Sequence, residues 1–222
     1  LAVTGGASFL GDPEKKTLDM YVEKINAEGG VLGRKLELIV YDSGGNPKKA
    51  VPFAKRLIND DKVDILLAGS TTGATMAVIP IVEKAGIPFI SFGGAGVIIN
   101  PVKKWVFKTP HTDTLAVKKI YTDMKARGIS KVGLLSGSGG FDKSCRKNVL
   151  ALAAGAGMSV VADETHGKGD TDMTAQITKI KNAAGVQAML YCGFGGATSI
   201  VAKNFKQLGV SIPHYQTHGS AS

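Results

Sequence analysis

Several segments rich in glycine and hydroxyl side chains follow the short apolar runs of this sequence. The clearest is Gly69–Gly73, which reads GSTTG and places the hydroxyls of Ser70, Thr71 and Thr72 directly before an expected helix. Free backbone N–H groups and the helix dipole favour an anion at such a position. A carboxylate of a small ligand would suit this site, and an N-cap role for Thr71 or Thr72 explains the same residues equally well.

Three other glycine-rich segments invite comparison with ligand-binding loops. The run Gly93-Gly94-Ala95-Gly96 permits close approach of a ligand to the backbone, or forms an ordinary turn. Residues 137–144, GSGGFDKS, resemble a phosphate-binding loop but carry Asp142 where that pattern requires glycine. Residues 193–198, GFGGAT, lack the third small residue of a dinucleotide loop. Neither of these last two segments therefore predicts a nucleotide cofactor.

The sequence has few side chains that could act in catalysis or bind a metal, and their spacing does not fit such sites. The four histidines, His111, His166, His214 and His218, show no metal-ligand spacing with each other, with cysteine or with acids. No GxSxG nucleophile motif is present. Only His218 stands at an expected strand end, where a loop role and a pocket role remain open. We therefore expect a binding protein without metal or cofactor, and not an enzyme.

The sequence contains two cysteines, Cys145 and Cys192. Cys145 falls in an expected helix and Cys192 at the end of an expected strand. Buried free thiols and a disulfide between them are both compatible with the sequence. Cysteine usage therefore does not decide the compartment.

Composition and charge narrow the class of protein. The chain has 222 residues, of which 44% are hydrophobic and 20% charged, as in globular proteins. Its net charge of +9 divides into +3 for residues 1–110 (14 basic, 11 acidic) and +6 for the rest (13 basic, 7 acidic). Lysines alternate with acids and aromatic residues are few, so we expect no nucleic-acid partner. No apolar run reaches the roughly 20 residues that span a bilayer.

Strand and helix patterns alternate along the chain. Expected strands cover residues 36–41, 63–68, 88–92, 102–108, 131–136, 159–165, 188–192 and 214–216. Two expected helices start at Asp12-Pro13 and Asn46-Pro47, and a third ends at about Ala85. Further expected helices cover residues 112–126, 141–154, 173–184 and 197–208. Short strands that are apolar on both faces are typical of parallel sheets covered by helices. Two sets of such units, separated near residue 110, predict an α/β fold with two Rossmann-like lobes.

One stretch carries a family resemblance. Residues 25–47, INAEGGVLGRKLELIVYDSGGNP, resemble a signature of type I periplasmic solute-binding proteins of the branched-chain amino acid ABC transporter class. The family signature is N-x-x-GG-x-x-G-[RK] followed by a strand that ends in an acidic residue. Further similar segments are Thr4–Gly6 with Leu10-Gly11, Asn46–Ala50, Ala85–Ser91 and Trp105–Lys108.

The resemblance implies a periplasmic binding protein type I fold and its function. Such proteins have two lobes joined by three crossovers, close over a small ligand and deliver it to the membrane permease of an ABC transporter. It implies residues 1–110 as the first lobe, 111–217 as the second and 218–222 as the start of a crossover. It also implies an exported, periplasmic monomer whose signal peptide is not in this chain. Because family members continue for roughly another hundred residues, we expect this chain to be incomplete at both ends.

The resemblance also assigns binding residues. It places the first-lobe carboxylate site on Ser70, Thr71 and Thr72, with Gly93, Gly94 and Ala95 in the neighbouring loop. It places the second-lobe aromatic on Phe141. Gly195 and Leu10 stand where many amino-acid binders carry aromatic residues, and His218 stands where they carry the carboxylate that pairs with the ammonium group of the ligand.

The histidine in that last position predicts the ligand class. An ammonium group buried without a carboxylate partner is costly, whereas histidine donates to a carboxylate or carbonyl oxygen. We therefore expect an organic acid without an α-amino group, such as an aromatic acid, and relatives with a similar YQTHG strand end look like aromatic-acid binders. A branched-chain or aromatic amino acid binder is the alternative. A sensory or regulatory domain of the same fold is a third.

Overall fold

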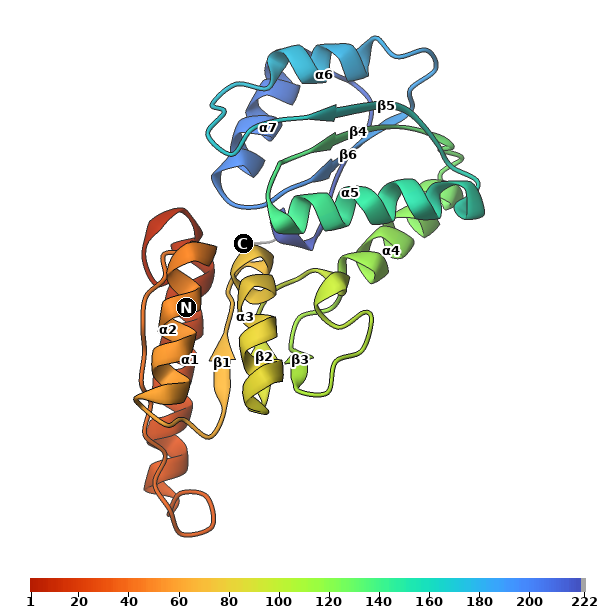
Figure 1. Cartoon of the computed structure of the whole chain (residues 1–222). Coiled ribbons are helices and arrows are strands. Elements are labelled where there is room, and N and C mark those ends of the chain that lie inside the picture. The colour runs from red at the N-terminus through yellow and green to blue at the C-terminus, as the bar shows by residue number, and fades with distance from the viewer. Residues whose placement is uncertain (221–222) are drawn as a thin grey trace. The chain divides into compact units, whose positions relative to one another are not determined.

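The computed structural model describes residues 1–220, which form two compact units (Figure 1). Unit 1 comprises Leu1–Gly93 and Ile98–Thr109, and unit 2 comprises Gly94–Val97 together with the chain from Pro110 onward. Each unit is built on a parallel sheet with helices packed on it. The predicted α/β fold with parallel sheets covered by helices is therefore confirmed. Residues 221–222, the end of the crossover predicted for 218–222, lie outside the described residues.

Unit 1 has a three-stranded parallel sheet and three helices. Its elements are α1 (Ser8–Ala27), α2 (Pro47–Asn59), β1 (Leu66–Ala68), α3 (Thr72–Ala85), β2 (Phe89–Ser91) and β3 (Val106–Lys108). The strand order is β1-β2-β3, with Leu66 opposite Phe89 and Phe89 opposite Val106. Helix α3 ends at Gly86, whose φ of 68° is the left-handed conformation that glycine adopts readily.

The start of unit 1 differs from the sequence prediction. A 3-10 turn at Gly5–Ala7 leads directly into α1, so the helix begins at Ser8 and not at Asp12-Pro13. Asp12 does not cap the helix, because its carboxylate pairs with Lys16 one turn later at 2.7 Å. Leu10 consequently lies inside α1 and not in a loop.

Residues 36–41, which were expected to form a strand, also do not pair with a neighbouring strand. This segment is extended, but the side-chain amide of Asn26 occupies both main-chain groups of Leu36, donating to its carbonyl at 2.8 Å and accepting from its N–H at 2.7 Å. Further along, the Leu1 N donates to the Tyr41 carbonyl at 3.1 Å and Ser43 N donates to the Leu1 carbonyl at 2.8 Å. A side chain and a few isolated bonds therefore replace the neighbouring strand that the pattern had implied.

Unit 2 has a four-stranded parallel sheet with helices on both faces (Figure 1). Its elements are α4 (Asp113–Ala126), β4 (Lys131–Ser136), α5 (Gly140–Ala153), β5 (Ser159–Thr165), α6 (Thr174–Lys181), β6 (Ala188–Cys192), α7 (Gly196–Gln207), β7 (His214–Gln216) and the 3-10 turn η4 (His218–Ser220). The strand order is β5-β4-β6-β7. Each expected strand of this unit has its predicted bounds, and α6 is shorter than predicted.

Alternation along the central strands separates two cores in unit 2. Leu134 and Leu190 face α4 and α5, whereas their neighbours Leu135 and Tyr191 face α6 and α7. All four side chains are fully buried. The sheet is therefore covered on both faces, which explains why its strands are almost uniformly apolar.

A disulfide joins Cys145 on α5 to Cys192 at the end of β6. Both residues are fully buried in the core that α4 and α5 form with the sheet. The sequence had left free thiols and a disulfide open, and the structure contains the disulfide. The link fixes the start of α5 to the carboxyl end of a central strand.

A histidine on β7 packs as a neutral, apolar side chain. The ring of His214 stacks on Phe205 with centroids 4.8 Å apart, and its buried Nε2 has no hydrogen-bond partner among the described residues. Burial lowers the pKa of His214 from 6.5 to about 4. Folding therefore opposes protonation of this ring.

The lowered pKa predicts acid sensitivity. Because the unfolded chain binds a proton below about pH 6.5 and the folded chain only below about pH 4, stability falls as pH drops through this window. At 1.36 kcal/mol per pKa unit, the loss from pH 7.5 to 4.5 is about 2–3 kcal/mol. We expect His214→Phe to lose about 2 kcal/mol less than the wild type over this range, measured by urea unfolding. Parallel losses in both proteins would contradict the assignment.

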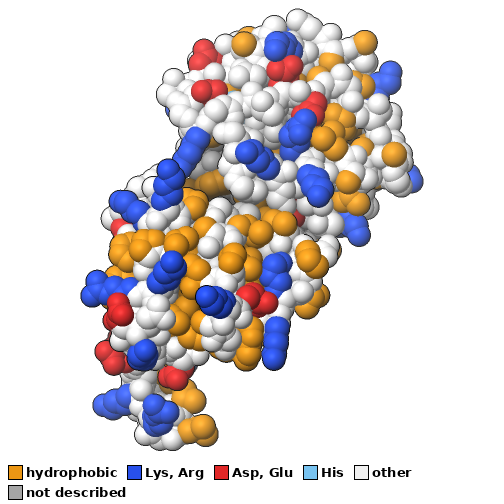
Figure 2. Space-filling model, viewed as in Figure 1, with side chains coloured by type: hydrophobic (Ala, Val, Ile, Leu, Met, Phe, Trp, Pro, Cys, Tyr) orange, Lys and Arg blue, Asp and Glu red, His pale blue; other side chains and the backbone are white. Residues whose placement is uncertain are grey.

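Positive charges are scattered over the face of the molecule that Figure 2 shows. Figure 2 shows Lys and Arg side chains spread over both units and interspersed with acidic and apolar atoms, without one dominant basic patch. Five lysine or arginine residues form ion pairs with acids, including Arg146 with Asp163. This distribution is typical of solvated helix faces. Among residues 1–220, none of the helices combines the length and apolar character needed to cross a membrane.

Candidate functional site

The carboxyl ends of the strands carry most of the predicted binding residues, in each unit separately. In unit 1 the loop after β1 contains Ser70, whose hydroxyl accepts from Ala2 N at 3.0 Å and donates to the Glu14 carboxylate at 2.5 Å. Burial raises the pKa of Glu14, and the Ser70 hydrogen bond opposes that rise. The hydroxyl of Ser70 is thus engaged in holding α1 to this loop.

The two threonines that follow Ser70 begin helix α3. Thr71 is the N-cap, and its hydroxyl accepts from Ala74 N at 3.4 Å and donates to the Gly45 carbonyl at 3.4 Å. Thr72 is buried, and its hydroxyl has no hydrogen-bond partner among the described residues. The capping role therefore falls on Thr71, and the Thr72 hydroxyl takes no part in it.

A buried hydroxyl network ties the loop after β2 to the loop after β1. Thr75 on α3 donates to the Gly69 carbonyl at 3.0 Å and lies 2.7 Å from the Ser91 hydroxyl. Gly93 N donates to the same Ser91 oxygen at 3.0 Å. A Cβ on Gly93 would lie 2.8 Å from Ile98 Cδ1 and 3.0 Å from the Thr75 hydroxyl, so a larger residue would displace these side chains. Gly93 therefore has a structural role, because its N–H group holds the loop to Ser91.

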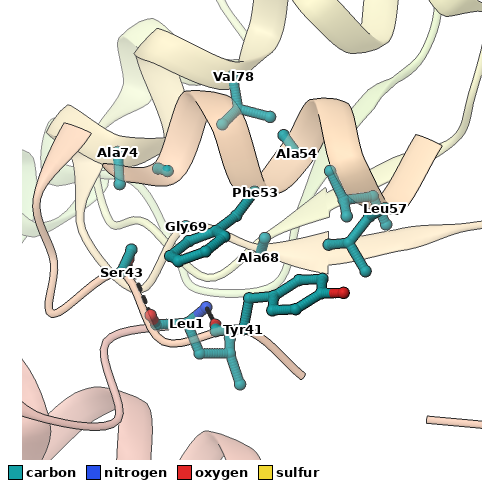
Figure 3. A pocket seen from close by; sticks show the side chains of 12 residues that line it. Leu1, Tyr41, Ser43, Phe53, Ala54, Leu57, Ala68, Gly69, Ala74 and Val78 are labelled. Atoms are coloured by element: carbon teal, nitrogen blue, oxygen red, sulfur yellow. Dashed lines mark hydrogen bonds between the residues drawn. The ribbon is translucent and has the colours of Figure 1, made fainter. Parts of the chain in front are cut away.

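The cavity drawn in Figure 3 lies in unit 1 and is too small for the expected ligands. Its volume is about 30 Å³, and its lining is mostly apolar. The rings of Tyr41 and Phe53 stack beside it, with centroids 5.1 Å apart. Such a space suits water or remains a packing defect, and it cannot hold an amino acid or an aromatic acid.

In unit 2, a cluster of rings gathers at the carboxyl end of the sheet. Phe141 at the start of α5 meets the Phe194 ring edge to face at 6.2 Å and the His218 ring at 5.1 Å. His111, just before α4, lies against His218 with ring centroids 4.2 Å apart. We call His111, Phe141, Phe194 and His218 the ring cluster. It brings together two of the predicted residues, Phe141 and His218, with two that were not predicted.

Two glycines let the backbone approach this ring cluster. A Cβ on Gly94 would lie 2.7 Å from His218 Nε2 and 3.2 Å from Phe141. A Cβ on Gly219 would lie 2.7 Å from the Gly193 carbonyl oxygen and 2.7 Å from Phe141. Gly94 therefore lies against the ring cluster.

The segment Gly94–Val97 is held in unit 2 by Asp113. Asp113 N donates to the Gly94 carbonyl at 3.3 Å, and Gly96 N donates to Asp113 Oδ1 at 2.8 Å. Asp113 is fully buried at the first turn of α4. Ala95, also fully buried, is enclosed by this two-way link. Its side chain has no exposed surface to offer a ligand.

The remaining predicted position, Gly195, precedes α7 with φ 67° and ψ −148°. This region of backbone space is essentially restricted to glycine. An aromatic side chain, as the resemblance places here in other members, would therefore require a different loop conformation. The aromatic surface nearby comes instead from Phe194.

A buried polar network supports the start of α5. Asp142 Oδ2 accepts from Gly139 N at 2.8 Å and caps the helix, and burial raises the Asp142 pKa. A Cβ on Gly137 would lie 2.4 Å from Asp142 Oδ2, so the loop after β4 closes on its own aspartate. This carboxylate fills the place that a phosphate would take, in keeping with the sequence argument against a phosphate-binding loop.

His166 belongs to the same buried region. Its Nδ1 lies 2.8 Å from the Gly167 carbonyl oxygen and its Nε2 lies 3.0 Å from the Tyr191 hydroxyl. Because a carbonyl only accepts, the neutral ring carries its proton on Nδ1 and Tyr191 donates to Nε2. Burial raises the Tyr191 pKa, so its hydroxyl keeps the proton. His166 is thus a structural residue.

Sequence reasoning missed His111, Asp113 and Phe194. A signal existed for Asp113, because Thr112-Asp113 begins a helix and follows a break at Thr109-Pro110. No local signal identified His111, which meets His218 only through packing. Among residues 1–220, no group of three or more histidine, cysteine or acidic side chains is arranged to hold a metal ion.

Comparison with known proteins provides independent information. A family model described as "Periplasmic binding protein" matches residues 1–222. The "Leucine-, isoleucine-, valine-, threonine-, and alanine-binding protein" of Pseudomonas aeruginosa is 29% identical over 213 residues, which are 94% of this chain and 56% of that protein. The chain thus spans about half the length of the curated relatives that it matches.

Two solved structures illustrate the similarity of fold. Rhodopseudomonas palustris (strain CGA009) Rp1789 has a TM-score of 0.88 and 29% identity, and the match covers 98% of this chain and 59% of that one. A solute-binding protein of an ABC transporter from Rhodopseudomonas palustris BisB5, in complex with 3,4-dihydroxybenzoic acid, has a TM-score of 0.85 and 22% identity. That match covers 98% of this chain and 60% of the other, and at this identity it shows the fold alone.

Proposed function

The chain belongs to the periplasmic binding protein family, in the type I class that includes the branched-chain amino acid binders, and we propose that it acts in the solute-binding component of an ABC importer. The family consists of solute-binding proteins and not of enzymes. The proposed ligand is a small organic acid without an α-amino group, such as an aromatic acid. The proposed partner is the permease of the transporter.

One observation carries the choice of ligand: His218 packs against Phe141 and His111 in unit 2. An amino-acid binder needs a carboxylate to balance the ligand's ammonium group, since an unbalanced buried charge is costly. The two acids nearest in sequence to the ring cluster, Asp113 and Asp142, are both buried, and each has one oxygen held by a loop N–H group and one oxygen without a hydrogen-bond partner among the described residues. Imidazole rings instead favour an oxygen acceptor, and Phe141 favours an apolar or aromatic body.

Each unit by itself offers binding groups. In unit 1 the first N–H groups of α3 suit a carboxylate, and in unit 2 His218 suits an oxygen acceptor of a ligand. Gly93, Gly94 and Gly195 leave their loops free of side chains. Ser70, Thr71, Ala95 and Leu10 are proposed only as supporting residues, given the hydrogen bonds and burial described above.

The competing ligand class is an amino acid. The Pseudomonas aeruginosa relative is named for leucine, isoleucine, valine, threonine and alanine, and the Rhodopseudomonas palustris BisB5 neighbour was crystallised with 3,4-dihydroxybenzoic acid. These two names set the probes for a decisive test. Isothermal titration calorimetry of the whole protein with leucine, valine, benzoate, 3,4-dihydroxybenzoate and phenylpyruvate should show binding of acids and no binding of leucine. Tight leucine binding would overturn the proposed ligand class.

A glycine substitution tests the ring cluster as part of the site. Gly94→Ala places a methyl group 2.7 Å from His218 Nε2, and the ring can move away. We therefore expect acid affinity to fall about tenfold, the equivalent of 1.4 kcal/mol, while the melting temperature changes little. Gly155→Ala is the matched control, because nothing lies within 4 Å of its added methyl group. Equal affinities in both variants would argue against the site.

Export to the periplasm is proposed from the family and supported by the disulfide. Family members act outside the cytoplasm, where disulfides form and persist. The Cys145–Cys192 bond is buried in the core of unit 2, as a structural disulfide of an exported protein would be. The proposal predicts that a precursor of this protein carries a signal for export, which sequencing of the gene tests directly.

A further inference from the structure

The pairing of two histidines in unit 2 points beyond the choice of ligand. His111 and His218 are separated by more than a hundred residues in the chain, yet their ring centroids lie 4.2 Å apart with planes inclined by 54°. His218 also meets the edge of Phe141 at 5.1 Å. His111 is exposed and His218 partly buried, so the pair reaches from the ring cluster to solvent.

Charged and titratable groups lie on the elements that carry the pair and its neighbours, and Lys108 precedes His111 in the chain. Helix α4 contributes Asp113, which accepts from Gly96 N and Thr114 N through Oδ1. Helix α5 contributes Asp142, which accepts from Gly139 N, and the exposed Lys143. His166, near Asp142, is bonded to Tyr191. The loop after β6 and the turn η4 have no charged side chain besides His218 itself.

Two imidazole rings at this distance influence each other's protonation. Like charges so close disfavour the state in which both rings carry a positive charge. An anionic oxygen at the pair has the opposite effect, because it favours imidazolium and accepts its N–H. Binding of an anion and uptake of a proton are then linked.

We propose that the His111–His218 pair binds an ionised oxygen of the ligand and takes up a proton from solvent as it does so. This inference rests on the proposed function, because it requires an acid as ligand. The ligand stays a carboxylate, a neutral imidazole becomes imidazolium, and no covalent bond forms or breaks. Ligands that bring an ionised oxygen to the pair are favoured over those that offer only a neutral hydroxyl.

The linkage has a measurable size. Because one imidazole of the pair is proposed to become imidazolium on binding, we expect uptake of about one half to one proton per bound acid at pH 7.5. Affinity should fall about 6- to 30-fold between pH 7.0 and 8.5, as the proton becomes harder to supply. A site that recognises the acid through backbone N–H groups alone would show neither effect.

The experiment is calorimetric titration of the whole protein with benzoate, 3,4-dihydroxybenzoate and phenylpyruvate. Each titration is run at pH 7.5 in phosphate, HEPES and Tris, whose ionisation enthalpies differ, and the slope of binding enthalpy against ionisation enthalpy counts the protons. A positive uptake supports the proposal. Acid binding without uptake overturns the proposal and leaves the acid-binding function intact. Leucine binding with no acid binding overturns both.

Substitutions of the two histidines test which side chains take up the proton. His111→Gln/His218→Gln should abolish uptake, and each single variant should reduce it and weaken binding about tenfold. His214→Phe is the matched control, since this histidine lies on β7 against Phe205 and should leave uptake unchanged. Full uptake in the double variant would overturn the assignment to this pair. If a variant fails to fold, as judged by circular dichroism, the pH dependence of wild-type affinity decides the question.

Discussion

His218→Asp is expected to weaken the binding of benzoate and related acids by at least about 100-fold. The change removes a donor and places a second negative charge where the ligand oxygen is proposed to bind. An unpaired buried charge costs about 3–5 kcal/mol, and each 1.4 kcal/mol is a factor of ten in affinity. Calorimetric titration of the variant with acids and with leucine measures the loss of acid affinity and the gain in leucine affinity, because the new carboxylate should improve leucine binding.

A matched substitution separates charge from shape in this experiment. His218→Gln keeps a hydrogen-bond donor without the negative charge, so the loss of acid affinity should be about tenfold. The ring contacts with Phe141 and His111 are lost in both variants. Equal acid affinity in the wild type and in the aspartate variant would remove His218 from the site.

Loss of the Cys145–Cys192 disulfide is expected to reduce the free energy of unfolding by about 4 kcal/mol. The bond closes a loop with a sequence separation of 47 residues. In the chain-entropy description, cross-linking such a loop restricts the unfolded chain by about this amount. Urea unfolding of the oxidised wild type and of Cys145→Ala/Cys192→Ala measures the difference, and the variant also pays for the buried volume that it loses.

Reduced wild type is the control for the cross-link. It retains both sulfur atoms in the core and lacks only the bond, so it should lose about 4 kcal/mol, and the double variant should lose more. Free-thiol titration confirms reduction before unfolding. Unchanged stability after complete reduction would show that the bond does not constrain unfolding.

Local patterns predicted most elements of unit 2 because its strands and helices are regular and covered on both sides. The strands at 131–136, 159–165, 188–192 and 214–216 appear with their predicted bounds. The strands expected at 63–68 and 102–108 are shorter, at Leu66–Ala68 and Val106–Lys108. The larger failures lie at the start of unit 1. There Asn26 takes the main-chain bonds of Leu36, and Asp12 pairs with Lys16 and does not cap α1. Propensity cannot anticipate a side chain that competes for the backbone.

The candidate site was predicted only where residues share a strand end. Phe141 and His218 could be placed at the carboxyl edge of one parallel sheet, because loops after parallel strands converge there. The engagement of Ser70 with Glu14 depends on how α1 packs against the loop after β1. That packing is a tertiary contact between residues far apart in the chain, and no short motif encodes it.

The sequence by itself determined the family, the α/β class and the set of loops that could bind a ligand, because these follow from periodicity and turn residues within short segments. Only the tertiary structure decided that Cys145 bonds to Cys192, that His111 meets His218, and that Gly195 adopts a backbone conformation closed to other residues. These outcomes depend on distances between elements and on local dihedral angles. Such quantities arise when helices pack on a sheet, and a linear pattern does not contain them.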